Sequence, residues 1–300
     1  MRDDQRVELE AAAAAWHQEG FVVLPRYLDA PDLDAARADL PKVFPSPSEF
    51  HSEPDGDRNS QYVTDEFGGI IEFPFPSVEL CRLVVHPKLI NLAEAIFRTD
   101  DIRVYASELW AKFTGAADYQ QEHHRDYLNH TPLVPSANAR YRGLEMFIWL
   151  NDVPEARGPT HIVPMTLTSN FPALPHGYLR EQQPEMYERE LSAAGSAGTV
   201  VAYSTDTFHR GTQMTEPGAA RYSAHVSYRH ADNQWTSRHA WGDRSFTTHW
   251  RPFVEHASPR QLRLFGFPAP GHPYWTQETL AGLRCRYPAM NMTSWEEAAS

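Results

Sequence analysis

The chain has 300 residues, with 27 lysines and arginines against 39 aspartates and glutamates, and a formal net charge of −12. This acidic balance argues against nucleic acid or an anionic membrane as a partner, because both attract basic surfaces. No segment has the pattern of a signal peptide or a membrane span, and no linker-like or low-complexity tract divides the chain. We therefore expect a single cytoplasmic domain over residues 1–300.

Near the start, residues 7–20 combine alanines with long-chain side chains and are predicted to form a packing helix. Residues 41–54 are rich in proline and are expected to form a surface loop. Cys81 and Cys285 are the only cysteines in the sequence, too few for a zinc cysteine cluster or a disulfide scaffold. We expect two free, buried thiols in a reducing compartment.

Stretches rich in β-branched and aromatic residues predict strands further along the chain. These stretches cover residues 102–113, 144–150, 198–203 and 220–229. Residues 166–198 separate the two halves of this β structure and are too long for an ordinary connection. We expect this insertion to form a lid or an added helix, because residues 184–194 carry helix formers and Pro184 suits a first helical turn.

Beyond Arg229 the sequence is crowded with large ring side chains. They are Trp235, His239, Trp241, Trp250, Phe253, Phe265, Phe267, Tyr274 and Trp275. Aromatic residues supply much of any protein core, so one interpretation is that this segment packs on the outside of the β structure. The other interpretation is a lid that closes over a substrate.

His124 and Asp126 stand two residues apart, between the strands predicted at 102–113 and 144–150. In an extended segment such positions project from the same face, so one imidazole and one carboxylate would face a single ion. His209 follows the strand predicted at 198–203 and could complete a three-ligand site. Two histidines and one carboxylate leave three octahedral positions open, the arrangement associated with non-haem Fe(II) oxygenases.

Other residues near this motif have competing interpretations. Glu122 also stands two residues from His124, so these two form a rival pair of ligands. His123 should point away from His124 in an extended segment and is expected to be a supporting or surface residue. His161 lies in an extended stretch and is expected to be packed or hydrogen-bonded rather than a ligand.

Arg221 and Ser223 share one face of the strand predicted at 220–229, again by the period of two. A guanidinium offers a planar fork of donors that matches a carboxylate, and a neighbouring hydroxyl adds another hydrogen bond. This face could therefore hold the distal carboxylate of 2-oxoglutarate.

Over most of its length the chain resembles the phytanoyl-CoA dioxygenase family of Fe(II)- and 2-oxoglutarate-dependent oxygenases. The order and spacing of several segments carry the resemblance: residues 19–24, His124-Arg125-Asp126, residues 149–154, residues 158–160, His209 and Arg221. Family members often have Trp-His-Gln-Asp where residues 123–126 read His-His-Arg-Asp. They often have Pro-Gly-Ser-His where residues 164–167 read Pro-Met-Thr-Leu. These differences from the family pattern lie next to the implied metal ligands and do not change the ligands themselves.

The resemblance implies a mainly β protein with packed helices, built on a double-stranded β-helix of the jelly-roll or cupin type. Iron would lie between its two sheets. The implied ligands are His124, Asp126 and His209, with Asp126 preferred over Glu122 because the family places its carboxylate after the histidine. The implied 2-oxoglutarate residues are Arg221, Ser223 and Lys112.

The implied reaction consumes O2 and 2-oxoglutarate and hydroxylates an aliphatic C–H bond of a small metabolite or natural-product intermediate, with succinate and CO2 as co-products. Desaturation or oxidative cyclisation would use the same site. A halogenase would need an open position where Asp126 stands. The candidate pocket residues on the strands and near the motif are Tyr105, Trp110, Tyr127, Phe147, His225 and Tyr228.

Two other classes of function stay open at this point. A non-catalytic, cupin-like binding protein would share the scaffold and bind metal or ligand without consuming 2-oxoglutarate. A hydrolytic zinc enzyme could use two histidines and a carboxylate, but it gives no reason for Arg221 to follow His209. The sequence does not indicate an oligomeric state.

Overall fold

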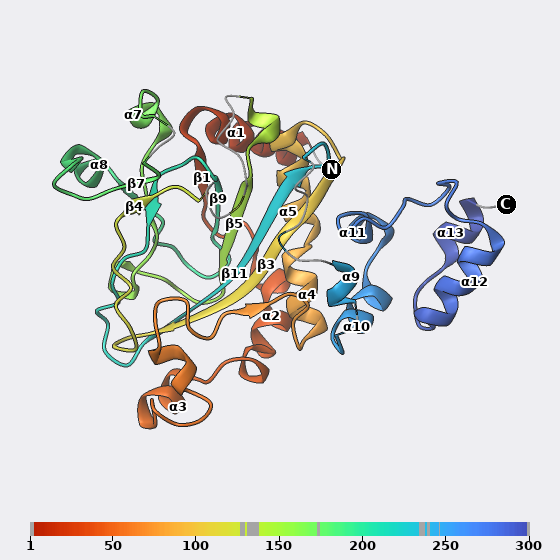
Figure 1. Cartoon of the computed structure of the whole chain (residues 1–300), viewed down its shortest axis with the longest axis horizontal. Helices are drawn as coiled ribbons and strands as arrows, with labels where there is room; N and C mark the ends of the chain where they lie inside the picture. The colour runs from red at the N-terminus through yellow and green to blue at the C-terminus, as the bar shows by residue number, and fades with distance from the viewer. Residues whose placement is uncertain are drawn as a thin grey trace.

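The structure is a computed structural model that describes residues 3–126, 130, 138–172, 175–233, 238, 241–245 and 247–298. It contains two antiparallel sheets, with helices packed against the larger one (Figure 1). Helices hold more of the described residues than strands do, so the fold is a mixture of helix and sheet rather than the mainly β protein expected. None of the described helices has the length and apolar character needed to cross a bilayer.

The larger sheet has six strands in the order β1-β9-β5-β11-β3-β2. Their bounds are β1 (Phe21–Leu24), β9 (Val200–Ser204), β5 (Leu144–Trp149), β11 (Ala220–His230), β3 (Ile102–Phe113) and β2 (Ile71–Glu72). β3, β5 and β11 confirm the strands predicted at 102–113, 144–150 and 220–229. β9 begins at Val200 rather than at residue 198. The two long strands, β3 and β11, are direct antiparallel neighbours.

The smaller sheet has five short strands in the order β7-β4-β10-β6-β8. Their bounds are β7 (Gly177–Tyr178), β4 (His123–His124), β10 (His209–Arg210), β6 (His161–Ile162) and β8 (Leu191–Ser192). The edge strands β7 and β8 both come from residues 166–198, so this insertion builds part of the sheet. The helix predicted at 184–194 is correct only at its start, because α8 (Pro184–Glu188) ends before β8 pairs with β6. Strand pairing there overrides helix propensity.

Helices from the first third of the chain cover one face of the larger sheet. They are α1 (Asp3–Glu19), α2 (Ala30–Ala38), α3 (Pro47–Ser52), α4 (Val78–Val84) and α5 (Pro87–Phe97). α1 confirms the helix predicted at 7–20. Alternate residues of β11 point to opposite faces of the sheet, and Ala224, Val226 and Tyr228 enter the apolar core that α4 and α5 share. The Tyr228 hydroxyl donates to the Val84 carbonyl at 2.9 Å, so Tyr228 is not the pocket residue that was expected.

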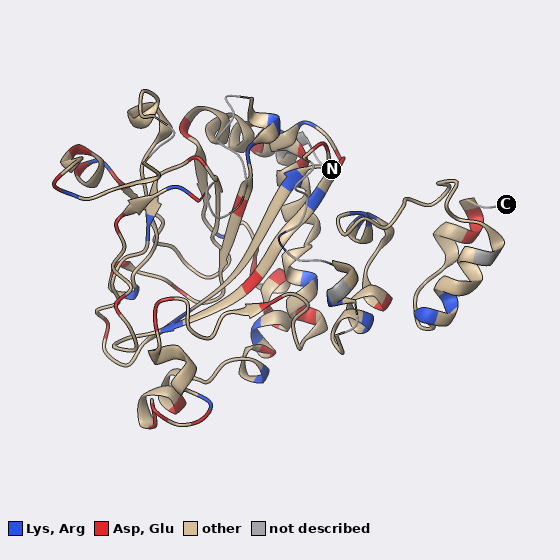
Figure 2. Ribbon diagram, viewed as in Figure 1, with Lys and Arg blue, Asp and Glu red and all other residues tan. Residues whose placement is uncertain are grey.

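The opposite face of the larger sheet is mixed, because β1, β5 and β9 carry a second apolar cluster while β3 and β11 carry charged and polar residues. Figure 2 shows acidic and basic residues along the helices and loops, and also on the long strands of this sheet. On β11 the residues of this face include Arg221, Ser223 and His225, and all three line a cavity. The smaller sheet contributes His124 and His209 to the same cavity. The cavity therefore lies between the larger sheet, whose other face packs on the helices, and the short strands of the smaller sheet.

The C-terminal helices lie at the end of the molecule away from β4 and β7 (Figure 1). They are α9 (Trp241–Arg244), α10 (Trp250–His256), α11 (Pro259–Arg263), α12 (Gln277–Arg286) and α13 (Thr293–Ala298). The Phe73 ring is the centre of the aromatic cluster that anchors α10 and the chain just after α11, 4.9 Å from Phe253 and 5.1 Å from Phe265 between centroids. This is outer packing. Among the described residues after β11, Arg238 lines the cavity, while Trp235 and His239 lie outside the described residues.

Two smaller expectations are wrong. Residues 41–54 are not simply a surface loop, because they contain α3, whose start is capped by reciprocal hydrogen bonds between Ser46 and Glu49. The Phe50 ring is buried and stacks on Phe113 at 4.2 Å. Of the two free thiols, Cys81 is buried as expected but Cys285 is exposed.

The remaining short helices are α7 (Met165–Thr168) and the 3-10 turns η1 (Leu40–Lys42), η2 (Ser60–Val63), η3 (Ala139–Tyr141) and η4 (Glu155–Arg157).

Candidate active site

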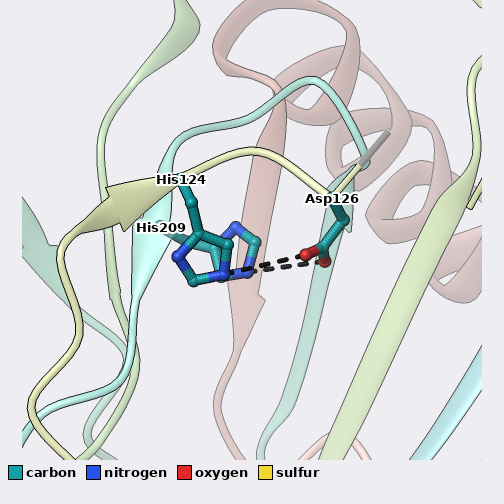
Figure 3. Close-up of side chains that lie close together, drawn as sticks. All are labelled: His124, Asp126 and His209. Carbon is teal, nitrogen blue, oxygen red and sulfur yellow. Dashed lines mark ion pairs between the residues drawn. The ribbon is translucent and has the colours of Figure 1, made fainter. Parts of the chain in front are cut away.

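The pairing of β4 with β10 brings two histidines together. His124 lies directly opposite His209 in the register, and their ring centroids are 4.6 Å apart. Asp126 follows β4, and its carboxylate faces both rings (Figure 3). Oδ1 of Asp126 is 3.8 Å from His124 Nε2, and Oδ2 is 3.4 Å from His209 Nε2. One ligand atom from each residue lies within 4.8 Å of the others, so a single ion could contact all three.

Backbone hydrogen bonds determine which ring nitrogens face this centre. His124 Nδ1 is 2.9 Å from the Glu122 carbonyl oxygen, and His209 Nδ1 is 3.1 Å from the Thr207 carbonyl oxygen. A carbonyl oxygen only accepts hydrogen bonds, so each Nδ1 carries the proton. The lone pair of each Nε2 is then free for a metal ion, as in metal sites whose histidines are held by a second hydrogen bond.

Burial and neighbouring charges favour the metal-binding protonation states. Burial lowers the pKa of His209 to about 4 although Asp126 opposes this, so the ring is neutral at pH 7. Burial alone would raise the pKa of Asp126, but the nearby His209, His130 and His124 hold it below its ordinary value. Tyr203 also donates its hydroxyl proton to Asp126 Oδ2 at 3.0 Å, which holds the carboxylate in one orientation. A neutral histidine and an ionised carboxylate are the forms that bind a metal.

Two buried cations lie side by side in the same cavity. Lys112 on β3 is directly opposite Arg221 on β11, and their residues are only 4% and 6% exposed. Nη1 of Arg221 is buried with no hydrogen-bond partner in the described part of the chain. Burial, and then the Arg221 charge, lower the pKa of Lys112 to about 7. An unpartnered guanidinium beside an ammonium is costly without an anion, so the pair fits a carboxylate ligand.

Ser223 lies on the same face as Arg221, next along β11. Its hydroxyl is 2.9 Å from His225 Nε2. Burial, followed by the charges of Arg221 and Lys112, lowers the pKa of His225 to about 3, so this ring is neutral and has one N–H. If Nε2 carries that proton, the Ser223 hydroxyl accepts from His225 and its own proton is free to reach a ligand.

All of these groups line one cavity of about 510 Å³. Its walls are partly aromatic, because Trp110 stacks on His225 at 4.8 Å and Phe147 lies 5.6 Å from the same ring. Phe67, which is 52% exposed, packs edge-on against Trp110 at 5.9 Å and also lines the cavity. Glu108 accepts a hydrogen bond from Trp110 Nε1 at 3.0 Å, and burial raises the pKa of its carboxyl. The cavity therefore combines a metal-ligand set, a cation pair and an aromatic wall.

A second charged cluster lines the cavity near Asp126. Glu145 on β5 accepts hydrogen bonds from Arg229 at 2.9 Å, from His130 at 3.1 Å and from the Ser227 hydroxyl. Burial alone would raise the pKa of Glu145, but His130 and Arg229 hold it well below its usual range. These partners satisfy Glu145 within the protein, in contrast to Arg221.

The structure separates the other candidate residues. The Glu122 carboxylate accepts the Tyr187 hydroxyl and does not join the three-residue cluster, so the rival pair is not assembled. Trp110, Phe147 and His225 line the cavity as expected. Tyr105 instead stacks against His130, 5.7 Å away, and under Arg229. Tyr127 lies outside the described residues, and none of the described residues of 166–198 lines the cavity.

Sequence reasoning missed several residues of the site. Tyr203 supports Asp126 from the end of β9, and Glu108 and Glu145 line the cavity from β3 and β5. The period of two gives one signal for the acids, because Glu108 shares a strand face with Lys112, as Glu145 does with Phe147. No local signal identifies Tyr203, because it meets Asp126 through tertiary contact alone.

Comparison with known proteins assigns the class of this chain. Residues 16–221 match the family model described as phytanoyl-CoA dioxygenase (PhyH). This match spans more than half of the chain and contains every residue of the metal-ligand set and the cation pair. The protein is therefore an Fe(II)/2-oxoglutarate-dependent enzyme, and it belongs to the phytanoyl-CoA dioxygenase family. No curated protein sequence matches the chain.

Solved structures share the fold at low identity. The epimerase SnoN, crystallised with Fe3+, alpha ketoglutarate and nogalamycin RO, is 19% identical, with a TM-score of 0.53 over 75% of this chain and 84% of its own. The carbocyclase SnoK from nogalamycin biosynthesis is 20% identical, with a TM-score of 0.50 over 75% of this chain and 87% of its own. EctD from S. alaskensis with bound Fe is 17% identical, with a TM-score of 0.54 over 80% of this chain and 82% of its own.

Proposed function

We propose that this enzyme hydroxylates an aliphatic C–H bond of a small metabolite or natural-product intermediate, with succinate and CO2 as co-products. The observation that supports this most is one cavity lined by His124, Asp126 and His209 and also by the cation pair of Lys112 and Arg221. A metal-ligand set alone would suit several chemistries. An unpartnered cation pair in the same cavity is what a keto acid with a distal carboxylate needs.

We also propose that the two sheets form a double-stranded β-helix and that residues 1–300 make one domain. The antiparallel pairing of both sheets and the likeness of the fold to SnoN and EctD support this architecture. In this view the N-terminal helices and the aromatic C-terminal segment are outer layers. The insertion at 166–198 extends the smaller sheet.

In this proposal His124, Asp126 and His209 hold Fe(II) through Nε2, a carboxylate oxygen and Nε2. Bound Fe(II) supplies the oxidation that side chains cannot perform, with 2-oxoglutarate as the co-substrate that is decarboxylated. Tyr203 keeps the Asp126 carboxylate oriented by donating to Oδ2 at 3.0 Å. The protein contributes fixed ligand geometry and a site shielded from bulk water.

The cation pair orients the co-substrate. Arg221 offers its free N–H groups as a fork to the distal carboxylate, and Lys112 adds an ammonium from the neighbouring strand. Ser223 adds a hydroxyl on the same face. Trp149 covers the guanidinium, whose carbon lies 5.5 Å from the ring centroid, and so keeps water away from it.

The substrate then occupies the rest of the cavity, between the metal ligands and Phe67. Trp110 and Phe147 offer apolar contact there, while Glu108 and Arg238, which form an ion pair at 2.9 Å, offer a polar edge. Oxidative cyclisation or desaturation is the second candidate reaction, because it needs the same ligands and because SnoK, which shares the fold, is described as a carbocyclase. The identity of the product distinguishes these reactions.

The test is succinate formation from 2-oxoglutarate by protein loaded anaerobically with Fe(II) and then exposed to O2, in the presence of a panel of small metabolites. Asp126→Ala should abolish it, and Glu122→Ala is the matched control that should retain it. Metal binding without succinate for any compound would favour a binding protein. Activity that depends on zinc, without 2-oxoglutarate consumption, would favour a hydrolase.

A further inference from the structure

Glu190, in the turn between α8 and β8, is the centre of a buried network behind the smaller sheet. Its side chain is 10% exposed. Oε2 accepts from Arg210 Nε at 2.7 Å and from His123 Nε2 at 2.7 Å, and Oε1 accepts from Arg210 Nη2 at 2.6 Å and from His161 Nδ1 at 2.8 Å. A carboxylate has roughly four acceptor positions. These donors therefore fill the carboxylate completely.

Two of the three donor residues come from the strands that carry the two histidines of the site, and His161 comes from the neighbouring strand β6. His123 precedes His124 on β4, and Arg210 follows His209 on β10. Successive strand residues point to opposite faces, so the histidines face the cavity while their neighbours face Glu190. The His123 side chain is fully buried and that of Arg210 is 5% exposed. One carboxylate thus joins the backs of both strands.

We propose that Glu190 is a positioning residue for the metal centre, which holds β4 and β10 at the separation that lets His124 and His209 bind one ion. This inference rests on the proposed metal site. The strands are only two residues long, so few ladder hydrogen bonds fix their spacing. The bidentate bond of Arg210 and the bond of His123 supply the missing constraint, because charge-assisted pairs are strong and directional.

The same network gives the insertion at 166–198 a role. The hydroxyl of Tyr187, on α8 just before this turn, accepts a hydrogen bond from the His123 backbone N–H at 3.1 Å. β7 pairs with β4 on its other side, with Gly177 opposite His124. The described residues of the insertion therefore support the ligand strand β4 at the edge that β10 leaves free and through its backbone.

The test is Fe(II) affinity of Glu190→Gln, measured anaerobically by competition with a chelator, together with the visible absorption spectrum of the Co(II)-loaded protein. The amide keeps the shape but turns a donor toward Arg210 or His123, so the Fe(II) Kd should rise by roughly 10- to 100-fold and the Co(II) spectrum should change. Glu155→Gln is the matched control. Glu155 also contacts His161, at 3.2 Å, but from an exposed position, so both readouts should match the wild type.

A second variant separates positioning from general stability. Glu190→Met combined with Arg210→Met replaces the buried ion pair by apolar groups, which is often neutral for folding. We expect the double variant to melt at a temperature near that of the wild type and to bind Fe(II) more weakly. Recovery of wild-type affinity in this double variant, or a Glu190→Gln Kd within about twofold of the wild type, would overturn it.

A third Glu190 variant and two reference proteins complete the test. If both variants fail to fold, Glu190→Asp keeps the charge, and the carboxylate retracted by one methylene should still weaken Fe(II) binding; unchanged affinity would contradict the proposal. If the wild-type protein itself binds no Fe(II), the proposed function fails and the positioning role of Glu190 fails with it; weakened binding in the variants alone, with normal binding in the wild type, tests Glu190 separately. His209→Ala is the reference for complete loss of the site.

Discussion

Replacing Lys112 by Met should make 2-oxoglutarate binding weaker and nearly independent of pH above neutrality. Lys112 has its pKa lowered from 10.5 to about 7 by burial and by Arg221. At pH values above 7 the apoprotein therefore carries a mostly neutral Lys112. A bound carboxylate favours the ammonium, so binding must take up a proton, and the affinity of the wild type should fall by up to roughly tenfold per pH unit above pH 7.

The lowered pKa of Lys112 also makes the stability of the apoprotein depend on pH. Between pH 7 and 10.5 the unfolded state binds more protons at this site than the folded apoprotein, so the stability of the apoprotein rises with pH in this window. Below pH 7 the lowered pKa of Lys112 opposes folding by on the order of 5 kcal/mol. Lys112→Met removes this cost, so the apo variant should melt at a higher temperature than the wild type at pH 7, and the difference should shrink toward pH 10.

The assay is anaerobic titration of the Fe(II)-loaded protein with 2-oxoglutarate, followed by the charge-transfer absorption of the chelate, from about pH 7 to about pH 9. Every other titrating group is present in Lys112→Met, so the variant is the baseline for the wild type. At pH 7 its Kd should be raised roughly 10- to 100-fold, the worth of one charged hydrogen bond. An equal pH slope in the two proteins would refute the assignment of Lys112 to the co-substrate.

Three further outcomes can be measured. Arg221→Ala should raise the 2-oxoglutarate Kd by roughly 10- to 100-fold and Arg221→Lys should recover only part of this, because a point charge cannot reproduce the fork; unchanged Kd values would move the anchor elsewhere. His124→Ala, Asp126→Ala and His209→Ala should each abolish Fe(II) binding in a metal titration, with apoprotein melting temperatures within roughly 5 °C of the wild type. Trp250→Ala should lower the free energy of unfolding by about 3–5 kcal/mol in denaturant titrations and leave the ratio of product to succinate unchanged. A fall in that ratio would instead support the interpretation that the C-terminal segment is a lid over the substrate.

The sequence predicted the elements whose side chains follow a simple period. The strands β3, β5 and β11 have continuous runs of β-branched and aromatic residues, and the spacing of His124 and Asp126 needs only an extended backbone. The helical start of the chain was equally clear. The resemblance to a family then placed His209 and Arg221 in the same site. The strand and helix predictions succeeded because each depends on local geometry, and the roles of His209 and Arg221 stay predictions that the metal and co-substrate titrations test.

The features that the sequence could not predict depend on pairing between distant segments. Lys112 and Arg221 are adjacent only because of the register between β3 and β11, which no local pattern specifies. Glu190 belongs to a segment that was expected to be helix or lid, and its partners lie on three different strands. Such clusters form from strand order, and strand order is a property of the whole fold.

The two faces of β11 explain how the enzyme tolerates an unpartnered guanidinium. Its other face carries Ala224, Val226 and Tyr228 into the apolar core, where helix packing supplies stability that does not depend on the cavity. This stability offsets the cost of keeping Arg221 buried with a free Nη1. In the proposed function the 2-oxoglutarate carboxylate removes part of that cost when it enters the cavity, and the pairing of β3 with β11 holds Lys112 and Arg221 in place before it arrives. In the proposed function, binding of 2-oxoglutarate then needs little rearrangement of Arg221 and Lys112, and this preorganisation contributes to the affinity.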